Sequence, residues 1–383
     1  MSGPHWQAAC PLPSGGGSTE RITLAHGEGG RLMRRLIGEV ILPVLARAHR
    51  GTPPIGGTLS VPAAQSDAAA LGDVAALSDA ATLGDAAVLP LLTSRPVLTT
   101  DSFVVSPLFF PGGDIGQLAV YGTVNDLVVA GAVPRWLSLA LVLEEGLPVD
   151  VLARVLESIA RAARESNVSI VTGDTKVVPR GTADGLFITT TGLGELVEPP
   201  PPGPAAIRPG DRLIVSGPIG QHGMAVLCSR ESLGFDPPPR SDSASLAEPV
   251  AALRRAGVVV RALRDATRGG VAAVLHEWAA AASGISFEVD QSRVPVSAEV
   301  RGACELLGLD PMHVANEGTF VAAVAPQAVD AALAALAAVQ QTVQAADIGQ
   351  AVPQAIAPVL VRRTLGSLEP LDEPAGAPLP RIC

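Results

Sequence analysis

The sequence predicts a two-domain α/β protein, and three observations carry this prediction. Extended and helical apolar patterns alternate along most of the 383 residues. The segment 198–209 is expected to be a linker, because five prolines within six residues can continue neither a helix nor a strand. Hydrophobic residues make up 48% of the chain and aromatic residues only 3%, so we expect cores built of alanine, valine and leucine.

The N-terminal domain is expected at 21–197. Residues 1–20 are rich in glycine, serine and proline and are expected to be disordered. "LAHGEGG" predicts a glycine turn that leads into an amphipathic helix, and the low-complexity segment 51–82 predicts a long loop. Periodicity predicts the remaining elements, namely strands at 96–105, 135–143, 168–178 and 185–196 and helices at 115–132 and 148–166.

The C-terminal domain is expected at 210–361, again with alternating elements. The predicted strands are 211–220, 285–290 and 319–326, and the predicted helices are 247–264, 270–282, 298–308 and 327–339. Periodicity is lost after residue 361. We therefore expect 362–383 to be a mobile C-terminal tail that carries Cys383.

Composition excludes several classes of protein. A net charge of −10 disfavours a nucleic-acid partner, which requires a basic surface. No apolar run is long enough to span a bilayer, and the N-terminus lacks the pattern of a secretion signal, so we expect a cytoplasmic protein without a membrane partner. The four cysteines are far apart, which indicates neither a zinc site nor a disulfide framework.

Lys176 is the only lysine among 27 lysine and arginine residues. Asparagine is also scarce, with Asn125, Asn167 and Asn316 as its three positions. Such depletion suggests that arginine has replaced lysine wherever only charge matters. A surviving lysine then suggests a role for a compact point charge or a titratable amine, although chance survival is the alternative.

Four aspartates lie at predicted strand ends, in turns or in an apolar helix, where their side chains can converge. They are Asp85, Asp101, Asp126 and Asp174. Separated carboxylates suit Mg²⁺, which takes one or two of them together with phosphate oxygens. Each aspartate alone is also compatible with a turn or a helix cap. Asp73 is a rival to Asp85 in the low-complexity segment.

Two glycine-rich turns precede predicted helices and can bind phosphate oxygens through backbone N–H groups. One is "HGEGG" at 26–30, which includes Gly29 and Gly30, and the other is "DATRGG" at 265–270, which includes Arg268. Neither matches an established phosphate-binding motif, and an ordinary helix start is the alternative for both.

Two further motifs contain the scarce residues. "TGDTKVV" places Lys176 two residues after Asp174, on the same side of an extended chain, with Thr175 between them. "ANEG" places Asn316 beside Glu317 in front of a predicted strand. Scarce residues therefore coincide with the candidate polar motifs.

These motifs, in collinear order from about Leu24 to Cys383, resemble the HypE family of hydrogenase maturation factors. The resemblance rests on "HGEGG", "SPLFFPGGDIG", "TGDTKVV", "DATRGG", "ANEG" and the terminal "PRIC". It implies the two-domain fold of the ATP-using superfamily related to aminoimidazole ribonucleotide synthetase. It also implies a homodimer formed through the N-terminal domain, with ATP near the dimer interface.

The resemblance implies that Cys383 is a substrate carried by the protein itself. ATP would convert a thiocarbamate on its sulfur into a thiocyanate, with Lys176 stabilising charge and Glu317 as the base. It assigns Mg²⁺ to Asp85, Asp101, Asp126 and Asp174. It assigns nucleotide contacts to the same aspartates and to Asn125, Thr175, Gly29, Gly30 and Arg268.

The implied partners are a HypF-type carbamoyltransferase that loads the cysteine and a HypC–HypD complex that accepts cyanide for a nickel–iron hydrogenase. One departure is Glu28, whose carboxylate would repel phosphate at the first glycine turn. The alternatives are a thiamine-phosphate kinase, a selenophosphate synthetase that uses Cys10, or a non-catalytic carrier of Cys383.

Overall fold

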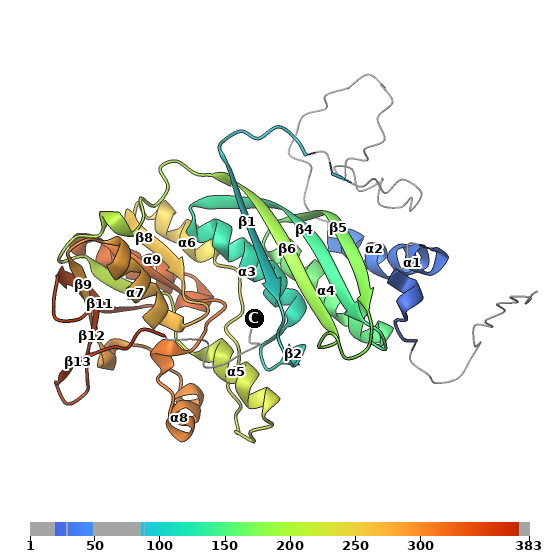
Figure 1. Ribbon diagram of the computed structural model, residues 1–383. Coiled ribbons are helices and arrows are strands. Elements are labelled where there is room, and N and C mark those ends of the chain that lie inside the picture. The colour runs from blue at the N-terminus through green and yellow to red at the C-terminus, as the bar shows by residue number, and fades with distance from the viewer. Residues whose placement is uncertain (1–19, 28–29, 49–85, 88, 375–383) are drawn as a thin grey trace, which may run out of the picture.

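The computed structural model describes residues 20–27, 30–48, 86–87 and 89–374 (Figure 1). The predicted loop at 51–82 and all but Glu20 of the predicted disordered extension lie outside these ranges. In the part of the chain described here, no helix combines the length and apolar character needed to cross a membrane.

A four-stranded sheet forms the N-terminal domain. Its strands are β1 (Pro96–Phe103), β4 (Ala132–Glu144), β5 (Ser169–Val178) and β6 (Leu186–Leu196). They lie in the order β1-β6-β4-β5, with β4 and β5 parallel and the other pairs antiparallel. All four predicted strands are thus confirmed, and β1 and β5 lie at opposite edges.

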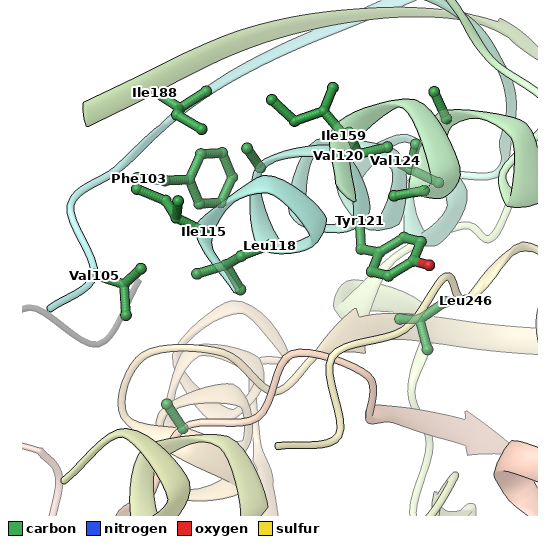
Figure 2. Packing of buried hydrophobic residues seen from close by; sticks show 14 of the residues in the cluster. Phe103, Val105, Ile115, Leu118, Val120, Tyr121, Val124, Ile159, Ile188 and Leu246 are labelled. Atoms are coloured by element: carbon green, nitrogen blue, oxygen red, sulfur yellow. The ribbon is translucent and has the colours of Figure 1, made fainter. Parts of the chain in front are cut away.

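Two helices, α3 (Ile115–Val129) and α4 (Val149–Glu165), cover one face of this sheet (Figure 1). Helix α3 begins after Asp114, whose carboxylate accepts hydrogen bonds from the N–H groups of Gly116 and Gln117. Almost all of its side chains are buried, because it packs between the sheet and the C-terminal domain. Figure 2 shows Phe103 on the sheet side of α3 and Leu246 of the C-terminal domain near Tyr121.

The N-terminal segment confirms the predicted turn and helix. It consists of η1 (Leu24–Gly27), α1 (Arg31–Arg35), η2 (Leu36–Ile41), which is a π-helical turn, and α2 (Leu42–Ala48). The turn η1 packs against β5 so closely that a Cβ on Gly27 would lie 2.9 Å from Val177 Cβ. The glycine turn is therefore held against the strand that carries Lys176.

A seven-stranded sheet forms the C-terminal domain. Its strands are β7 (Arg212–Val215), β8 (Val260–Asp265), β9 (Ile285–Asp290), β10 (Phe320–Val324), β11 (Ala346–Pro353), β12 (Val359–Arg362) and β13 (Leu368–Pro370). The order is β13-β12-β9-β11-β7-β10-β8. Among the described strand pairs of this sheet, only β12 and β9 are parallel. Its helices are α5 (Gln221–Arg230), α6 (Ala247–Arg255), α7 (Gly270–Ala281), α8 (Ala298–Leu307) and α9 (Val329–Ala337). Sequence periodicity missed β11, β12, α5 and the short hairpin of β2 (Phe109–Phe110) and β3 (Gly113–Asp114).

The predicted helix at 247–264 is wrong in its second half. Helix α6 ends at Arg255, because Gly257 adopts a φ of 70°, the left-handed conformation that terminates helices. The β-branched residues after it then enter strand β8, at the edge of the sheet. This correction places Asp265 at the end of a strand.

The tail predicted to start at 362 also needs correction. Strand β13 pairs with β12, and the buried Leu371 donates its backbone N–H to Val359 O. Residues 362–371 are therefore bound to the C-terminal sheet. Sequence periodicity missed this because the three residues of β13 are too short to show alternation.

Candidate active site

The side-chain amide of Asn125 joins the two domains. Asn125 lies on α3, is 2% exposed, and donates through Nδ2 to the backbone oxygens of Ala244 and Glu317 at 3.0 and 3.4 Å. Its Oδ1 accepts a hydrogen bond from the N–H of Leu246 at 2.7 Å. These bonds hold the helix that carries Asp126 against the turn that carries Glu317. The expected contact of Asn125 with nucleotide stays a prediction.

A carboxylate that the sequence did not single out shapes the turn at Glu317. Asp242 accepts hydrogen bonds from the N–H groups of Glu317 and Gly318 at 3.1 and 3.0 Å and from Thr319 Oγ1 at 2.9 Å. A Cβ on Gly318 would lie 1.8 Å from Asp242 O, so only glycine allows the two segments to approach this closely. Asp242 therefore fixes the backbone of the candidate base.

Four acidic side chains from different elements influence one another at the junction of the domains. We call Asp101 on β1, Asp126 on α3, Asp265 at the end of β8 and Glu317 before β10 the acidic cluster. The N-terminal domain supplies two members and the C-terminal domain two. The cluster therefore exists only while the two domains are docked.

Burial dominates the pKa of the two C-terminal members. Glu317 is 4% exposed, and burial, followed by the charges of Asp242 and Asp265, raises its pKa well above the usual value. Burial, followed by the charge of Asp126, raises the pKa of Asp265 to about 6. The cluster thus binds protons more tightly than ordinary carboxyl groups do.

The two N-terminal members are stabilised in part by hydrogen bonds. Burial raises the pKa of Asp126, while a hydrogen bond of 2.8 Å from Thr99 Oγ1 opposes that shift. Burial also raises the pKa of Asp101, whose Oδ1 accepts the N–H of Ser102 at 2.8 Å. Neither bond offsets the cost of burial.

Two arginines lie near the acidic cluster on its exposed side. The charge of Arg268, in the predicted glycine turn, opposes part of the rise in the pKa of Asp101, and the charge of Arg264 does the same for Asp126 and Asp265. Arg264 Nε lies 3.9 Å from Asp265 Oδ1, and its side chain is 51% exposed. Two largely hydrated arginines therefore oppose four carboxyl groups.

The acidic cluster fits a cation shared with phosphate better than a metal bound by protein alone. Among residues 20–27, 30–48, 86–87 and 89–374, no group of three or more histidine, cysteine, aspartate or glutamate side chains has the arrangement of a metal site. Mg²⁺ needs only one or two carboxylates when phosphate oxygens and water complete its shell. Asp101 and Asp126 can supply these carboxylates. Burial disfavours their charged forms and raises their pKa values, and a bound cation would offset that cost.

The predicted set of four aspartates does not assemble within one chain. Asp174 lies on β5 and Asp101 on β1, three strand spacings or about 14 Å apart across the sheet. Asp85 lies outside the described residues. Metal binding by all four aspartates stays a prediction.

Lys176 and Asp174 point to the same side of β5, as their spacing predicted. Lys176 Nζ lies 3.0 Å from Asp174 Oδ2, and this contact lowers the pKa of Asp174. Both side chains are more than half exposed, and alternation along β5 places them on the opposite face from the buried Thr175. Thr175 is 7% exposed. The described chain thus leaves the lysine accessible, away from the acidic cluster.

The two glycine turns differ in their backbone conformation. Gly30 precedes α1 with extended backbone, and Gly29 lies outside the described residues. Gly269 and Gly270 adopt φ values of 79° and 62° at the start of α7, and a Cβ on Gly270 would lie 2.5 Å from Met312 O. Glycine is therefore required next to Arg268. Phosphate binding at either turn stays a prediction.

The remaining predicted residue, Cys383, lies outside the described residues. Sequence reasoning missed Asp242 and Asp265 as members of the site. Asp265 had a usable signal, since it opens "DATRGG" directly after an apolar strand. Asp242 lies in an irregular loop and had no signal.

Sequence profiles identify the class of protein that this fold and site define. The profile of "AIR synthase related protein, N-terminal domain" matches residues 83–196, and that of "AIR synthase related protein, C-terminal domain" matches residues 208–360. The chain therefore has both domains of the AIR synthase-related proteins.

Individual relatives narrow this class. "Carbamoyl dehydratase HypE" of Rhizobium leguminosarum bv. viciae is 44% identical over 364 residues, which are 95% of each chain. A crystal structure of "Hydrogenase Maturation Protein HypE in complex with ATP" is similar with a TM-score of 0.80 and 41% identity, over 94% of this chain and 99% of that one. A "HypE-HypF complex" gives a TM-score of 0.70 and 43% identity, over 74% and 92%. This chain belongs to the HypE family of carbamoyl dehydratases, which serve hydrogenase maturation.

We predict that Asn125→Ala weakens the docking of the domains. The substitution leaves buried backbone groups at Ala244 and Leu246 without their partner, so the free energy of unfolding should fall by about 2 kcal/mol. Urea unfolding and hydrogen exchange at the Leu246 amide measure this effect. Asn167→Gly, at an exposed position, is the control, and an unchanged exchange rate in Asn125→Ala would contradict the role of the amide.

The raised pKa of Asp265 predicts a pH-dependent stability. An unfolded aspartate titrates near 3.8 and the folded one near 6, so the folded state binds more protons between these values. Stability from this group is present below 3.8 and is lost as the pH rises through about 6. Asp265→Asn should therefore be more stable than the natural chain at neutral pH, by up to about 3 kcal/mol, and similar to it near pH 4.

Urea unfolding without nucleotide at both pH values measures the difference. Glu157→Gln on the exposed face of α4 is the control, because its carboxylate is hydrated. Equal stabilities of Asp265→Asn and the natural chain at neutral pH would show that burial does not strain this carboxylate.

Proposed function

We propose that this chain dehydrates a carbamoyl group carried on its own Cys383, with ATP as the co-substrate. The observation that carries the proposal is the docked acidic cluster, beside which the last described residues of the chain end. A HypE relative crystallised with ATP supports the choice of nucleotide. Membership of the HypE family supports the reaction.

The described chain ends beside the turn that carries Arg268. Pro374 is the last described residue, and its Cγ lies 3.4 Å from the position that a Cβ on Gly269 would take. Gly269 follows Arg268, whose charge acts on Asp101. Nine residues follow Pro374, the last of which is Cys383, and an extended chain of nine residues spans at most about 32 Å.

The reaction needs the carbamoyl oxygen to become a leaving group. The carbamoyl oxygen accepts the γ-phosphoryl group of ATP, and ADP is formed. The C–O bond then breaks and phosphate is released. The two N–H protons are lost during this elimination, and the carbon remains on sulfur as a thiocyanate. Mg²⁺, held by Asp101 and Asp126 together with the phosphates, would offset the negative charge of nucleotide and protein.

Glu317 is the proposed base for the N–H protons. Its raised pKa favours the protonated form, and a base must be ionised. Positive charge that enters the acidic cluster lowers this pKa, so the proposal couples nucleotide binding to activation of Glu317. Asp242 holds the backbone of Glu317 in place while the carboxyl group of Glu317 loses its proton.

Lys176 is proposed to act from a second copy of the chain. The outer face of the N-terminal sheet, which carries Lys176 and Asp174, is not covered by helices α3 and α4 (Figure 1). Leu98 on the same face is 69% exposed. Pairing of two such faces in a homodimer would bring the lysine of one chain toward the nucleotide of the other, where it would stabilise charge on the activated oxygen.

Two partners complete the proposed cycle. A HypF-type carbamoyltransferase would load Cys383, which the crystallised HypE–HypF relative supports. A HypC–HypD complex would accept the cyano group for the iron of a nickel–iron hydrogenase. Cys383 must therefore meet three sites in turn, which requires a tether rather than a fixed position.

The central test is the mass of the C-terminal peptide. Carbamoylated protein mixed with Mg-ATP should lose the mass of one water from the peptide that contains Cys383, with one ATP consumed for each loss. Cys383→Ala should abolish the loss and retain ATP binding. ATP consumption with an unchanged peptide mass would contradict the dehydratase, and no ATP consumption would indicate a non-catalytic carrier.

Lys176→Arg should retain the fold and lose most of the turnover, by about 10²-fold or more. A guanidinium is planar and bulkier than an ammonium, so it does not reproduce a compact point charge. Single-turnover dehydration rates measure the effect, with Arg34→Lys on the exposed face of α1 as the control. A fully active Lys176→Arg would mean that this lysine survives by chance.

A further inference from the structure

Two histidines from separate elements hold consecutive backbone carbonyls near the C-terminus. His276 Nε2 on α7 lies 3.0 Å from Leu371 O, and His313 Nε2 in the turn η7 (Pro311–His313) lies 2.9 Å from Asp372 O. A carbonyl oxygen only accepts hydrogen bonds, so both rings must carry a proton on Nε2. The two contacts thus define the donor of each ring.

The contacts continue a fixed path of the chain. Leu371 is 4% exposed and donates its N–H to Val359 O at 3.0 Å. Pro374 then reaches the start of α7 beside Gly269. The chain is therefore held from the sheet to the turn that carries Arg268.

We propose that His276 and His313 are positioning residues that fix the origin of the tether for Cys383 beside the acidic cluster. This inference rests on the proposed function, in which Cys383 carries the substrate. With both contacts present, nine residues follow the last described position, Pro374. Without them, the last attachment is the backbone hydrogen bond from Leu371 N–H to Val359 O, so the tether lengthens from nine to twelve residues.

The anchor changes how often the thiocarbamate meets the site. The effective concentration of a tethered group falls with about the −3/2 power of tether length, so the added length alone lowers it about 1.5-fold. Loss of the fixed starting direction lowers it further. We expect a fall of about two- to tenfold in the rate of the tethered reaction.

The first test compares the tethered reaction with the same reaction on a separate peptide. The natural chain, His276→Ala, His313→Ala and the double variant are carbamoylated on Cys383, and single-turnover loss of water is followed with saturating Mg-ATP. In parallel, each variant combined with Cys383→Ser acts on a synthetic peptide "LPRIC" carbamoylated on sulfur. Loss of the anchor in the alanine variants should slow the tethered reaction and leave kcat/KM for the peptide unchanged.

His276→Gln and His313→Gln are the matched controls, because a glutamine amide can place an N–H donor near the position of Nε2. They should restore the tethered rate. An equal loss in both reactions would assign the histidines a merely structural role, and an unchanged tethered rate in the double Ala variant would overturn the proposal.

A distance measurement separates this inference from the proposed function. Spin labels are placed on Cys383 and on Arg254→Cys, an exposed position of α6, in a chain with Cys10→Ser. Cys228 and Cys304 are buried, at 4% and 2% exposure, and should not be labelled. The distance distribution should broaden in His313→Ala and recover in His313→Gln. An identical distribution in all variants overturns the anchor even if the natural chain dehydrates its tail, whereas broadening without any dehydration refutes only the proposed function.

Discussion

The amide of Asn125 is the interaction on which the candidate site depends. It bonds three backbone groups of the C-terminal domain from a helix of the N-terminal domain, and all three bonds are buried or partly buried. The next residue, Asp126, and the bonded residue, Glu317, belong to the acidic cluster. This side chain therefore helps to set the distance between carboxyl groups of the two domains. Because a buried amide without partners is costly, one relative position of the two domains is favoured.

The acidic cluster explains why such a junction would bind a metal nucleotide. Burial raises the pKa of all four carboxyl groups, neighbouring carboxylates raise it further at Asp101, Asp265 and Glu317, and the nearby arginines remain hydrated. Such a site repels free phosphate. A divalent cation that is bound to the phosphate reduces the repulsion among the carboxylates. The same coupling ties the proposed base to occupancy of the site, since added positive charge favours ionised Glu317. The clustering of buried carboxyl groups thus explains both the cost of their burial and the proposed chemistry.

Sequence reasoning predicted the architecture well and the site only in parts. Strands and helices of the N-terminal domain followed from apolar periodicity, whereas β13 was too short for a pattern and Gly257 ended a helix that seemed continuous. Asp101, Asp126 and Glu317 were found because they stand out in apolar or turn contexts. Asp242 could not be found, because its role comes from three hydrogen bonds to a turn more than seventy residues away. Contacts between domains leave no periodic trace in sequence.

Calorimetry of a non-hydrolysable ATP analogue tests the two-domain acidic site most directly. Titrations near pH 6, where Asp265 is half ionised, are run in two buffers of different ionisation enthalpy, with Mg²⁺ or with EDTA. A site built on carboxyl groups of raised pKa should bind the analogue only with Mg²⁺ and release protons as it binds. Proton release should fall in Asp265→Asn. Equal affinity in EDTA, with no proton release, would contradict a nucleotide site at the acidic cluster.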